Sequence, residues 1–377
     1  MKLFEISHMD KTSSARRGRL HLPHGVVETP AFMPVGTNGT VKSMTHSDLE
    51  SMGIKMILAN TYHLYLRPGI EVIQQAGGLH AFSSWPFNIL TDSGGYQVFS
   101  LAHLRKVKDE GVRFQSHIDG SYHEFTPEKV VDIQKDLGSD IAMPLDVCTP
   151  PGIGWKKAAE AVDITTKWLQ RSKKRWLTCK EGWQGYLFGI IQGNFFADLR
   201  CRSTIETLEL DLPGVAIGGL SVGETWNEFC DFLAITADNL PQEIPHYVMG
   251  IGTPDFIFES VANGIDIFDC VYPTRTARTG MVFSATGMVN LKKQYNAKLM
   301  EPIDMTCRCP TCARYTKAYL RHLFKANEIL GIMLATQHNL FFIESMMDKI
   351  RVSITSGQFA ILKRTFLETF TNGSNGN

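Results

Sequence analysis

The chain has 377 residues, 44% of them hydrophobic, which is enough for one large α/β barrel or two ordinary domains. Lys and Arg total 38, as do Asp and Glu, so the protein has no overall charge that attracts nucleic acid, and such binding would need a local basic patch. No apolar run reaches the roughly 20 residues that span a bilayer, and no signal-peptide stretch begins the chain, so we expect a cytoplasmic protein without membrane contact.

Eight short apolar runs have the length and near-continuous hydrophobicity of strands buried on both faces. They are Ala31 to Val35, Lys55 to Ala59, Phe87 to Thr91, Asp140 to Leu145, Tyr186 to Ile191, Val215 to Ile217, His246 to Met249 and Ile265 to Phe268. The residues directly after them are polar or glycine: Gly36, Asn60, Asp92, Asp146, Gln192, Gly218, Gly250 and Asp269. Functional groups at the carboxyl ends of eight parallel strands describe a (β/α)8 barrel. We therefore predict an α/β fold in which residues 1–377 form a single barrel domain.

Helix and turn signals lie between these runs. Thr126-Pro127-Glu128 and Thr253-Pro254-Asp255 each place a capping hydroxyl before a proline and an acid in the first turn. Residues 156–176 and 226–240 also have a helical pattern. One interval is too long for a plain βα unit, and within it Val112 to Phe125 is typical of a hairpin that turns at Asp119-Gly120. We expect this hairpin to be an insertion on the barrel.

The segment from Gly264 to Gly280 combines a strand end, a carboxylate and two arginines. Branched apolar residues lead up to Asp269, and Pro273 prevents the strand from continuing far beyond it. Arg275 and Arg278 follow, and guanidinium groups suit a polyanionic substrate such as RNA phosphate. The segment therefore indicates a reactive carboxylate with arginines that hold the substrate. A buried Asp that caps a turn, next to surface arginines, is the simpler alternative.

A basic stretch contains a cluster of cysteines. From Arg275 to Lys325 there are ten cationic residues and only two acidic ones. Cys307, Cys309 and Cys312 place three thiolates within one tight turn, and His338 would complete a tetrahedral zinc site, although a lone histidine is more often a core residue. Such a site has no open position for water, so we expect one structural Zn²⁺ in an embedded subdomain at about residues 300–345.

Asp92, Asp146 and Asp269 are expected to project into the same mouth of the barrel. Asp92 begins the string Asp-Ser-Gly-Gly-Tyr-Gln, whose paired glycines let backbone amides approach a ligand closely. Two carboxylates on either side of a sugar permit a double displacement, in which one attacks the anomeric carbon and the other handles protons. The third could then bind a base, or be a satisfied buried carboxylate. A hydrolytic glycosidase would share the carboxylates, but would not account for a thiolate zinc site beside an arginine-rich segment.

Five strings of this sequence occur together in one known family. They are Asp92 to Gln97, Asn60-Thr61-Tyr62-His63-Leu64 with Leu66-Arg67-Pro68-Gly69, Gly218-Gly219-Leu220, Asp269-Cys270-Val271 with the arginines after it, and the Cys-x-Cys-x2-Cys…His set. From about Phe32 to Leu340 the chain resembles the queuine tRNA-ribosyltransferases, the bacterial-type tRNA-guanine transglycosylases. The resemblance implies that guanine at the wobble position of a GUN anticodon is exchanged for a 7-deazaguanine base. A catalytically silent tRNA-binding subunit is an alternative within the family, but it predicts a missing carboxylate.

The resemblance also implies roles for single residues. Asp269 is similar to the nucleophile that bonds to ribose C1′, and Asp92 to the general acid/base. Positions similar to the base-binding ones are Asn60, Tyr96, Asp146, Gln192, Gly218, Gly219, Leu220 and Met249. Arg275 and Arg278 are similar to the pair that holds the nucleotides next to the target, while residues 300–345 would contact the tRNA. Core filling is the alternative for Tyr96 and Met249. A homodimer is also implied, with an aromatic cluster near its contact: Phe82, Trp85, Tyr319 and His322.

Departures from the family pattern lie beside the expected base pocket. Eukaryotic members that accept queuine usually have glycine where this chain has Val222, and a valine there would narrow the pocket. We therefore expect the incoming base to be 7-aminomethyl-7-deazaguanine, the smaller queuosine precursor. Its ammonium group would donate to the Leu220 carbonyl, which Glu224 would hold in place. Val147 replaces a usual glutamate and Ser221 is the eukaryotic-like residue, so queuine remains the alternative.

Overall fold

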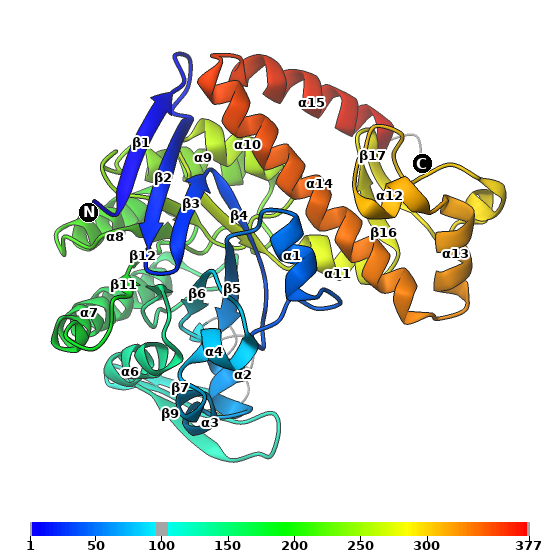
Figure 1. Ribbon diagram of the computed structural model, residues 1–377. Helices are drawn as coiled ribbons and strands as arrows, with labels where there is room; N and C mark the ends of the chain where they lie inside the picture. The colour runs from blue at the N-terminus through cyan, green and yellow to red at the C-terminus, as the bar shows by residue number, and fades with distance from the viewer. Residues whose placement is uncertain (1, 96–104, 375–377) are drawn as a thin grey trace.

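The computed structural model describes residues 2–95 and 105–374, with a closed barrel of parallel strands at its centre (Figure 1). In barrel order the strands are β4 (Ala31–Pro34), β5 (Met56–Asn60), β6 (Asn88–Asp92), β10 (Ile141–Ala142), β11 (Tyr186–Leu187) continued by β12 (Gly189–Ile191), β13 (Val215–Ile217), β14 (His246–Val248) and β15 (Ile267–Cys270). Neighbouring strands pair in parallel, and β15 pairs with β4. A bridge between Val35 and Leu58 joins β4 to β5. The predicted barrel is therefore confirmed.

Side chains along the barrel strands alternate between two buried clusters. Residues that point into the barrel include Met33, Met56, Leu90, Ile190, Ala216, Tyr247 and Ile267. Their neighbours in sequence, which pack against the surrounding helices, include Phe32, Ile57, Ile89, Ile191, Ile217, Val248 and Phe268. Because both faces of every strand are buried, the strands have the nearly continuous hydrophobicity from which they were predicted.

Helices surround the barrel (Figure 1), and most of them begin after the carboxyl end of a barrel strand; α3 and α4 instead follow α2, and α6 follows the inserted sheet. They are α1 (His46–Ser51), α2 (Thr61–Leu66), α3 (Ile70–Gln75), α4 (Leu79–Ser83), α6 (Pro127–Leu137), α7 (Trp155–Cys179), α8 (Ala197–Leu208), α9 (Trp226–Ala237), α10 (Pro254–Ala262) and α11 (Tyr272–Arg278). The Thr126 side chain caps α6 as predicted, whereas Thr253, at the start of α10, makes no capping hydrogen bond within the described residues. No helix in the described ranges combines the length and apolar character needed to cross a bilayer.

The predicted insertion is a three-stranded antiparallel sheet. It consists of β7 (Arg105–Lys108), β8 (Gly111–Gln115) and β9 (Tyr122–Phe125). The expected hairpin corresponds to β8 and β9, and Gly120 has the positive φ of 75° that its turn requires. Val112, Phe114 and Phe125 are buried in the same cluster as the outer barrel face, so the inserted sheet is fastened to the barrel by apolar packing.

An antiparallel sheet that sequence reasoning missed precedes the barrel. Its strands are β1 (Phe4–Met9), β2 (Arg16–Leu22) and β3 (Gly25–Thr29). Phe4, Leu20 and Val27 join the cluster inside the barrel, so this sheet closes one end of it. Arg16 and Asp266 form a buried ion pair at 2.5 Å that connects the sheet to the segment before β15. Burying a charge pair of this kind requires good hydrogen-bond geometry, and Arg16 Nη1 and Nη2 also donate to two backbone carbonyls.

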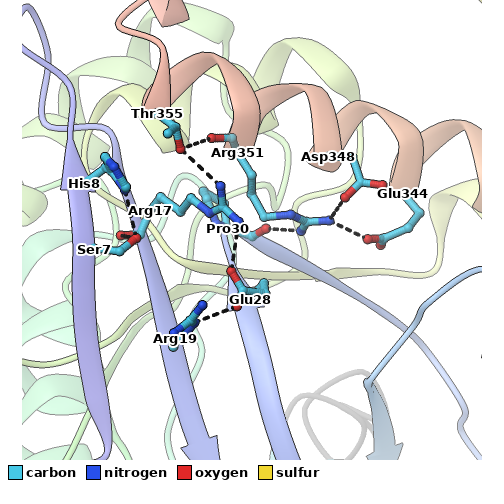
Figure 2. Close-up of polar contacts among 10 residues, drawn as sticks. All are labelled: Ser7, His8, Arg17, Arg19, Glu28, Pro30, Glu344, Asp348, Arg351 and Thr355. Atoms are coloured by element: carbon cyan, nitrogen blue, oxygen red, sulfur yellow. Dashed lines mark hydrogen bonds and ion pairs between the residues drawn. The ribbon is translucent and has the colours of Figure 1, made fainter.

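In the C-terminal part, residues 277–335 supply a separate apolar cluster beside the barrel, whereas most of the long helix that follows packs against the outer barrel cluster. The elements of the C-terminal part are β16 (Met281–Ser284), β17 (Gly287–Asn290), η2 (Gln294–Lys298), α12 (Pro310–Arg314), α13 (Lys317–Lys325), α14 (Ile329–Thr355) and α15 (Phe359–Ser374). Figure 2 shows how the end of α14 is fixed: Arg351 donates to the Pro30 carbonyl at 2.6 Å and to the carboxylates of Glu344 and Asp348. Arg17 of β2 bonds to Thr355, so α14 links the cysteine cluster to the N-terminal sheet.

Candidate active site and metal centre

The polar residues that follow the barrel strands come together at one end of the barrel. Ile267 points into the barrel, and Asp269, two positions later, lies on the same side because side chains along a strand repeat every two residues. Leu90 and Asp92 have the same relation. Other such pairs are Leu58 with Asn60, Ile190 with Gln192, Ala216 with Gly218, and Tyr247 with Met249.

Asp269 is a half-buried carboxylate held in one orientation. Its Oδ1 accepts hydrogen bonds from the Tyr247 hydroxyl at 2.6 Å and from the Gly250 amide at 2.8 Å. Burial raises the pKa of Asp269, while these two bonds act in the opposite direction. Both bonds go to Oδ1, so within the described part of the chain Oδ2 has no donor. The protein therefore fixes one oxygen of this carboxylate by two hydrogen bonds.

Tyr247 is a candidate site residue that sequence reasoning missed, because it lies within an apolar run and has the pattern of a core residue. It is fully buried inside the barrel, and its hydroxyl is the donor to Asp269. Burial first, and then the charge of Asp269, raise the pKa of Tyr247 far above its usual value, and Asp92 adds to this effect. The tyrosine therefore stays protonated and lies within the field of both carboxylates.

Asp92 is held by the last residue of β5 and by backbone amides just after β5 and β6. Asn60 Nδ2 donates to its Oδ2 at 2.7 Å, and the amides of Thr61 and Gly94 donate to Oδ1, each at 3.2 Å. The pairing of β5 with β6 places Asn60 directly beside Asp92. Gly94 has a φ of 78°, and a Cβ there would lie 2.8 Å from that of Tyr62, so the close approach of this turn requires glycine.

Asp146 and Gln192 form a buried hydrogen-bonded pair. Gln192 Nε2 donates to Asp146 Oδ2 at 2.7 Å, and burial raises the pKa of Asp146 to about 6. A Cβ at Gly95 would lie 2.7 Å from Asp146 Oδ1, so the glycine lets the backbone reach this carboxylate. The pair offers an acceptor and an amide next to each other, which is a suitable arrangement for the edge of a purine.

Gly218 and Gly219 pack directly against this pair. A Cβ at Gly218 would lie 2.7 Å from Gln192 Nε2, and one at Gly219 would lie 2.5 Å from Gln192 Oε1. Arg200, which the sequence did not single out, is fully buried and donates to the carbonyls of Gly218, Gly219 and Asn194. Burial lowers its pKa to about 10, so it is charged at neutral pH. Arg200 thus ties the loops after β12 and β13 together.

The loop after Gly219 is held by Glu224. Its carboxylate accepts hydrogen bonds from the amides of Ser221, Val222 and Gly223. The carbonyl of a trans peptide points away from its N–H, so the Leu220 carbonyl points away from Glu224. Leu220 itself is buried and Val222 is half-buried.

The remaining residues expected at the pocket have different surroundings. Met249 is half-buried against the cluster inside the barrel. Val147 is buried, and its amide donates to Thr165 Oγ1 at 3.0 Å. Tyr96 lies outside the described residues.

Arg275 and Arg278 lie one turn apart on α11, directly after Asp269. Arg275 is exposed and Arg278 is half-buried. Burial, and then the charge of Arg275, lower the pKa of Arg278. Arg278 Nη1 is buried and has no hydrogen-bond partner among the described residues, so this guanidinium could still accept an anionic ligand.

The expected zinc ligands form a compact group. The three sulfurs and His338 Nδ1 lie within 4.8 Å of one another, and Nδ1 is 3.7 Å from Cys307 Sγ, 3.4 Å from Cys309 Sγ and 3.3 Å from Cys312 Sγ. Zinc bonds of about 2.3 Å to sulfur and 2.0–2.1 Å to nitrogen give a sulfur–nitrogen separation of about 3.6 Å in a tetrahedron. The distances therefore fit one tetrahedral ion.

The orientation of His338 supports the same interpretation. Its Nε2 lies 2.6 Å from the Phe283 carbonyl, to which it donates, so Nδ1 carries the lone pair that faces the sulfurs. Cys309, Cys312 and His338 are buried, and the cysteines belong to the apolar cluster of the C-terminal part. A buried Cys3His group with no fifth position is compatible with a structural zinc ion.

The residues expected near a subunit contact have mixed exposure. Phe82 and Tyr319 are about two-fifths exposed, and His322 is exposed. Trp85 is buried, with its indole N–H on the Asn88 carbonyl, so it offers no surface for such a contact.

Comparison with known proteins gives a consistent result. The family model described as Queuine tRNA-ribosyltransferase matches residues 10–372. A protein of that name from Treponema denticola is 51% identical over 371 residues, 98% of each chain, and one from Borrelia duttonii is 48% identical over 372 residues, 99% of each. Another from Desulforudis audaxviator is 51% identical over 365 residues, 97% of each. The resemblance and the expected enzyme class, a pentosyltransferase, are confirmed, and the chain belongs to the queuine tRNA-ribosyltransferase family, the tRNA-guanine transglycosylases.

Proposed function

We propose that this protein exchanges guanine at the wobble position of tRNAs with a GUN anticodon for a 7-deazaguanine base, through a covalent bond between Asp269 and ribose C1′. The observation that carries the proposal is the Asp269 carboxylate at the barrel mouth, whose Oδ1 is fixed by Tyr247 and Gly250 and whose Oδ2 has no donor among the described residues. We also propose that the reaction takes place in the cytoplasm.

The exchange proceeds in two displacements at the same carbon. Asp269 Oδ2 attacks C1′ and the bond to guanine breaks, which gives a ribosyl ester. The incoming base then attacks C1′ through its ring nitrogen and releases the carboxylate. Two inversions retain the configuration at C1′, as in retaining glycosidases.

Asp92 is the proposed acid/base. A proton has to reach the departing guanine and another has to leave the incoming base, so one group can serve both steps. Asn60 and the amides of Thr61 and Gly94 hold Asp92 at the mouth near Tyr247, which contacts Asp269. Asn60 acts here as a positioning residue.

Asp146, Gln192, Gly218, Gly219 and Leu220 are the proposed base-reading groups. Asp146 accepts from the purine, Gln192 donates to it, and the backbone after β13 completes the contact. Arg200 donates hydrogen bonds to the carbonyls of Gly218 and Gly219. In a trans peptide the N–H points opposite to the carbonyl, so the N–H groups of these two peptides face away from Arg200. Met249, and Tyr96 outside the described residues, would cover the two faces of the base.

The proposed tRNA contacts begin with Arg275 and Arg278. The buried Nη1 of Arg278 without a described partner suits a phosphate, which accepts several hydrogen bonds from a guanidinium. We also propose that residues 300–345 form a subdomain that holds Zn²⁺ and contacts tRNA. A homodimer with Phe82, Tyr319 and His322 near its contact follows from the family resemblance, and a solution mass corresponding to a monomer would contradict it.

The proposed incoming base is 7-aminomethyl-7-deazaguanine. Glu224 binds the amide of Ser221, so the carbonyl of the same peptide, Leu220, is directed away from Glu224 and can accept from the ammonium of this base. Val222 is half-buried in the same loop and limits the space for a larger 7-substituent.

Competition between the two free bases is expected to favour the aminomethyl base over queuine by about tenfold to a hundredfold in kcat/KM, because an overpacked pocket costs ~1–3 kcal/mol. The measurement is exchange of each labelled base into the same tRNA. Val222→Gly is the matched variant and should narrow the difference. A higher kcat/KM for queuine with the unchanged protein would show that Val222 does not set the pocket size.

Tyr247→Phe is expected to lower kcat about tenfold to a hundredfold, since a hydrogen bond to a charged group contributes ~1.5–3 kcal/mol. In the unchanged protein the hydrogen bond from Tyr247 lowers the pKa of Asp269. Its removal should therefore raise this pKa and move the acid limb of the kcat/KM profile to higher pH. Tyr186→Phe, at the start of β11, is the matched control. An unshifted pH profile would argue against the contact between Tyr247 and a reacting Asp269.

The proposed function itself is tested by incubating the protein with unmodified tRNA and labelled guanine. Label in the wobble nucleotide is expected. Binding of tRNA without any incorporation would instead favour a silent tRNA-binding subunit.

A further inference from the structure

Arg200 is a buried cation that is hydrogen-bonded to peptide groups. It lies on α8 and its side chain is fully buried. Among the described residues its nitrogens donate only to the carbonyls of Asn194, Gly218 and Gly219, at 2.9, 2.9 and 3.2 Å. A charge rarely leaves water without a carboxylate partner, because the desolvation is costly. The cost of this arrangement indicates that the guanidinium has a role in the loop that supplies two of these carbonyls.

That loop, which follows β13, has two backbone N–H groups without an acceptor. The N–H groups of residues 221–223 all donate to Glu224. Those of Gly219 and Leu220, directly before them, have no hydrogen-bond partner among the described residues, although Leu220 is buried. Buried N–H groups are rarely left unpaired in proteins. The two adjacent donors therefore indicate where an acceptor on a ligand would lie.

Arg200 sets the direction of these two N–H groups. Each belongs to a peptide whose carbonyl, that of Gly218 or Gly219, accepts from the guanidinium, so both N–H groups point away from it. Gly219 has a φ of 70°, and successive N–H groups in such a turn form a concavity that attracts negative charge, including the partial charge of a carbonyl oxygen. The same glycines pack against Gln192, which donates to Asp146, so the concavity lies beside the proposed base-reading pair.

We propose that Arg200 is a positioning residue for base recognition, which holds the N–H groups of Gly219 and Leu220 toward the pocket to bind the ring carbonyl oxygen of the purine. The inference rests on the proposed function and names a residue that determines which base is accepted. A purine with an oxygen at C6 satisfies both donors, whereas a purine without this oxygen leaves them unpaired and loses affinity. The positive charge behind the two peptides strengthens their bonds to the oxygen.

The test measures two constants during exchange with tRNA: KM for labelled guanine and the inhibition constant of 2-aminopurine, which lacks the oxygen at C6. The unchanged protein should favour guanine by about tenfold or more, since a site that binds a polar atom rejects the analogue without it. Arg200→Met keeps most of the stem and removes the guanidinium. It should raise KM for guanine about tenfold and leave the inhibition constant of 2-aminopurine and KM for tRNA nearly unchanged.

Two further variants control for effects on folding and on charge. Arg202→Met is the matched control, because Arg202 lies on the same helix but forms ion pairs with Asp163 and Glu206. It should leave both constants unchanged. Arg200→Lys keeps the charge with fewer donors and should give a smaller rise in KM for guanine. It carries the test if Arg200→Met shows no cooperative unfolding transition.

An equal rise in both constants would mean that Arg200 only connects the loops after β12 and β13, and would overturn the inference. Equal affinity of the unchanged protein for guanine and 2-aminopurine, or the same loss in Arg202→Met, would overturn it as well. Absence of guanine exchange by the unchanged protein would instead refute the proposed function.

Discussion

Asp269→Asn is expected to abolish exchange, with a fall of at least about 10⁴-fold, together with any enzyme–tRNA adduct that survives denaturation. An amide is a far poorer nucleophile than a carboxylate, and loss of a covalent nucleophile removes the whole double displacement. The substitution leaves Oδ1 able to accept from Tyr247 and Gly250, so the barrel mouth should keep its shape. Adduct formation is measured by the shift of the protein in a denaturing gel.

The control for this variant is Asp238→Asn, the same change at the exposed end of α9, which should leave both exchange and adduct intact. Affinity for tRNA should also persist in Asp269→Asn, because it depends on phosphate contacts. An adduct that persisted in Asp269→Asn would assign the nucleophile to another residue.

Cys309→Ser is expected to lower the zinc content and to decrease the free energy of unfolding by roughly 4 kcal/mol or more, an effect typical of a lost metal site. Cys309 is buried, and its sulfur is 3.4 Å from His338 Nδ1. A serine hydroxyl is a weaker ligand, and without the ion the remaining thiolates would repel one another inside an apolar cluster. Elemental analysis and denaturant unfolding provide the two measurements.

The matched control is Cys201→Ser on α8, away from the metal group, which should retain zinc and stability. None of the four expected ligands contacts Asp92 or Asp269, so the Cys309→Ser molecules that remain folded should still catalyse base exchange. Purified unchanged protein without zinc would refute the metal site.

The barrel and the polar residues at its mouth could be predicted from local sequence patterns. Strands buried on both faces have continuous apolar runs. Asp92 and Asp269 follow the apolar runs of β6 and β15, and the two-residue repeat of side chains along a strand is enough to place both carboxylates at the same end of the barrel. The expected metal ligands could also be identified from the sequence, since three of the four lie within six residues. The N-terminal sheet was missed because β2 alternates basic and apolar residues and is only half-buried, so it has no continuous apolar run.

The contacts that hold these groups in place could not be predicted, because they join segments that are distant in the sequence. Tyr247 has the pattern of a core residue until the pairing of β14 with β15 brings its hydroxyl to Asp269. Arg200 lies in an ordinary helix, and its carbonyl partners are known only once α8 packs beneath the loops after β12 and β13. The same holds for the Phe283 carbonyl behind His338, 55 residues away. Local spacing fixes which side chains end a strand, whereas contacts between distant segments depend on how those segments pack.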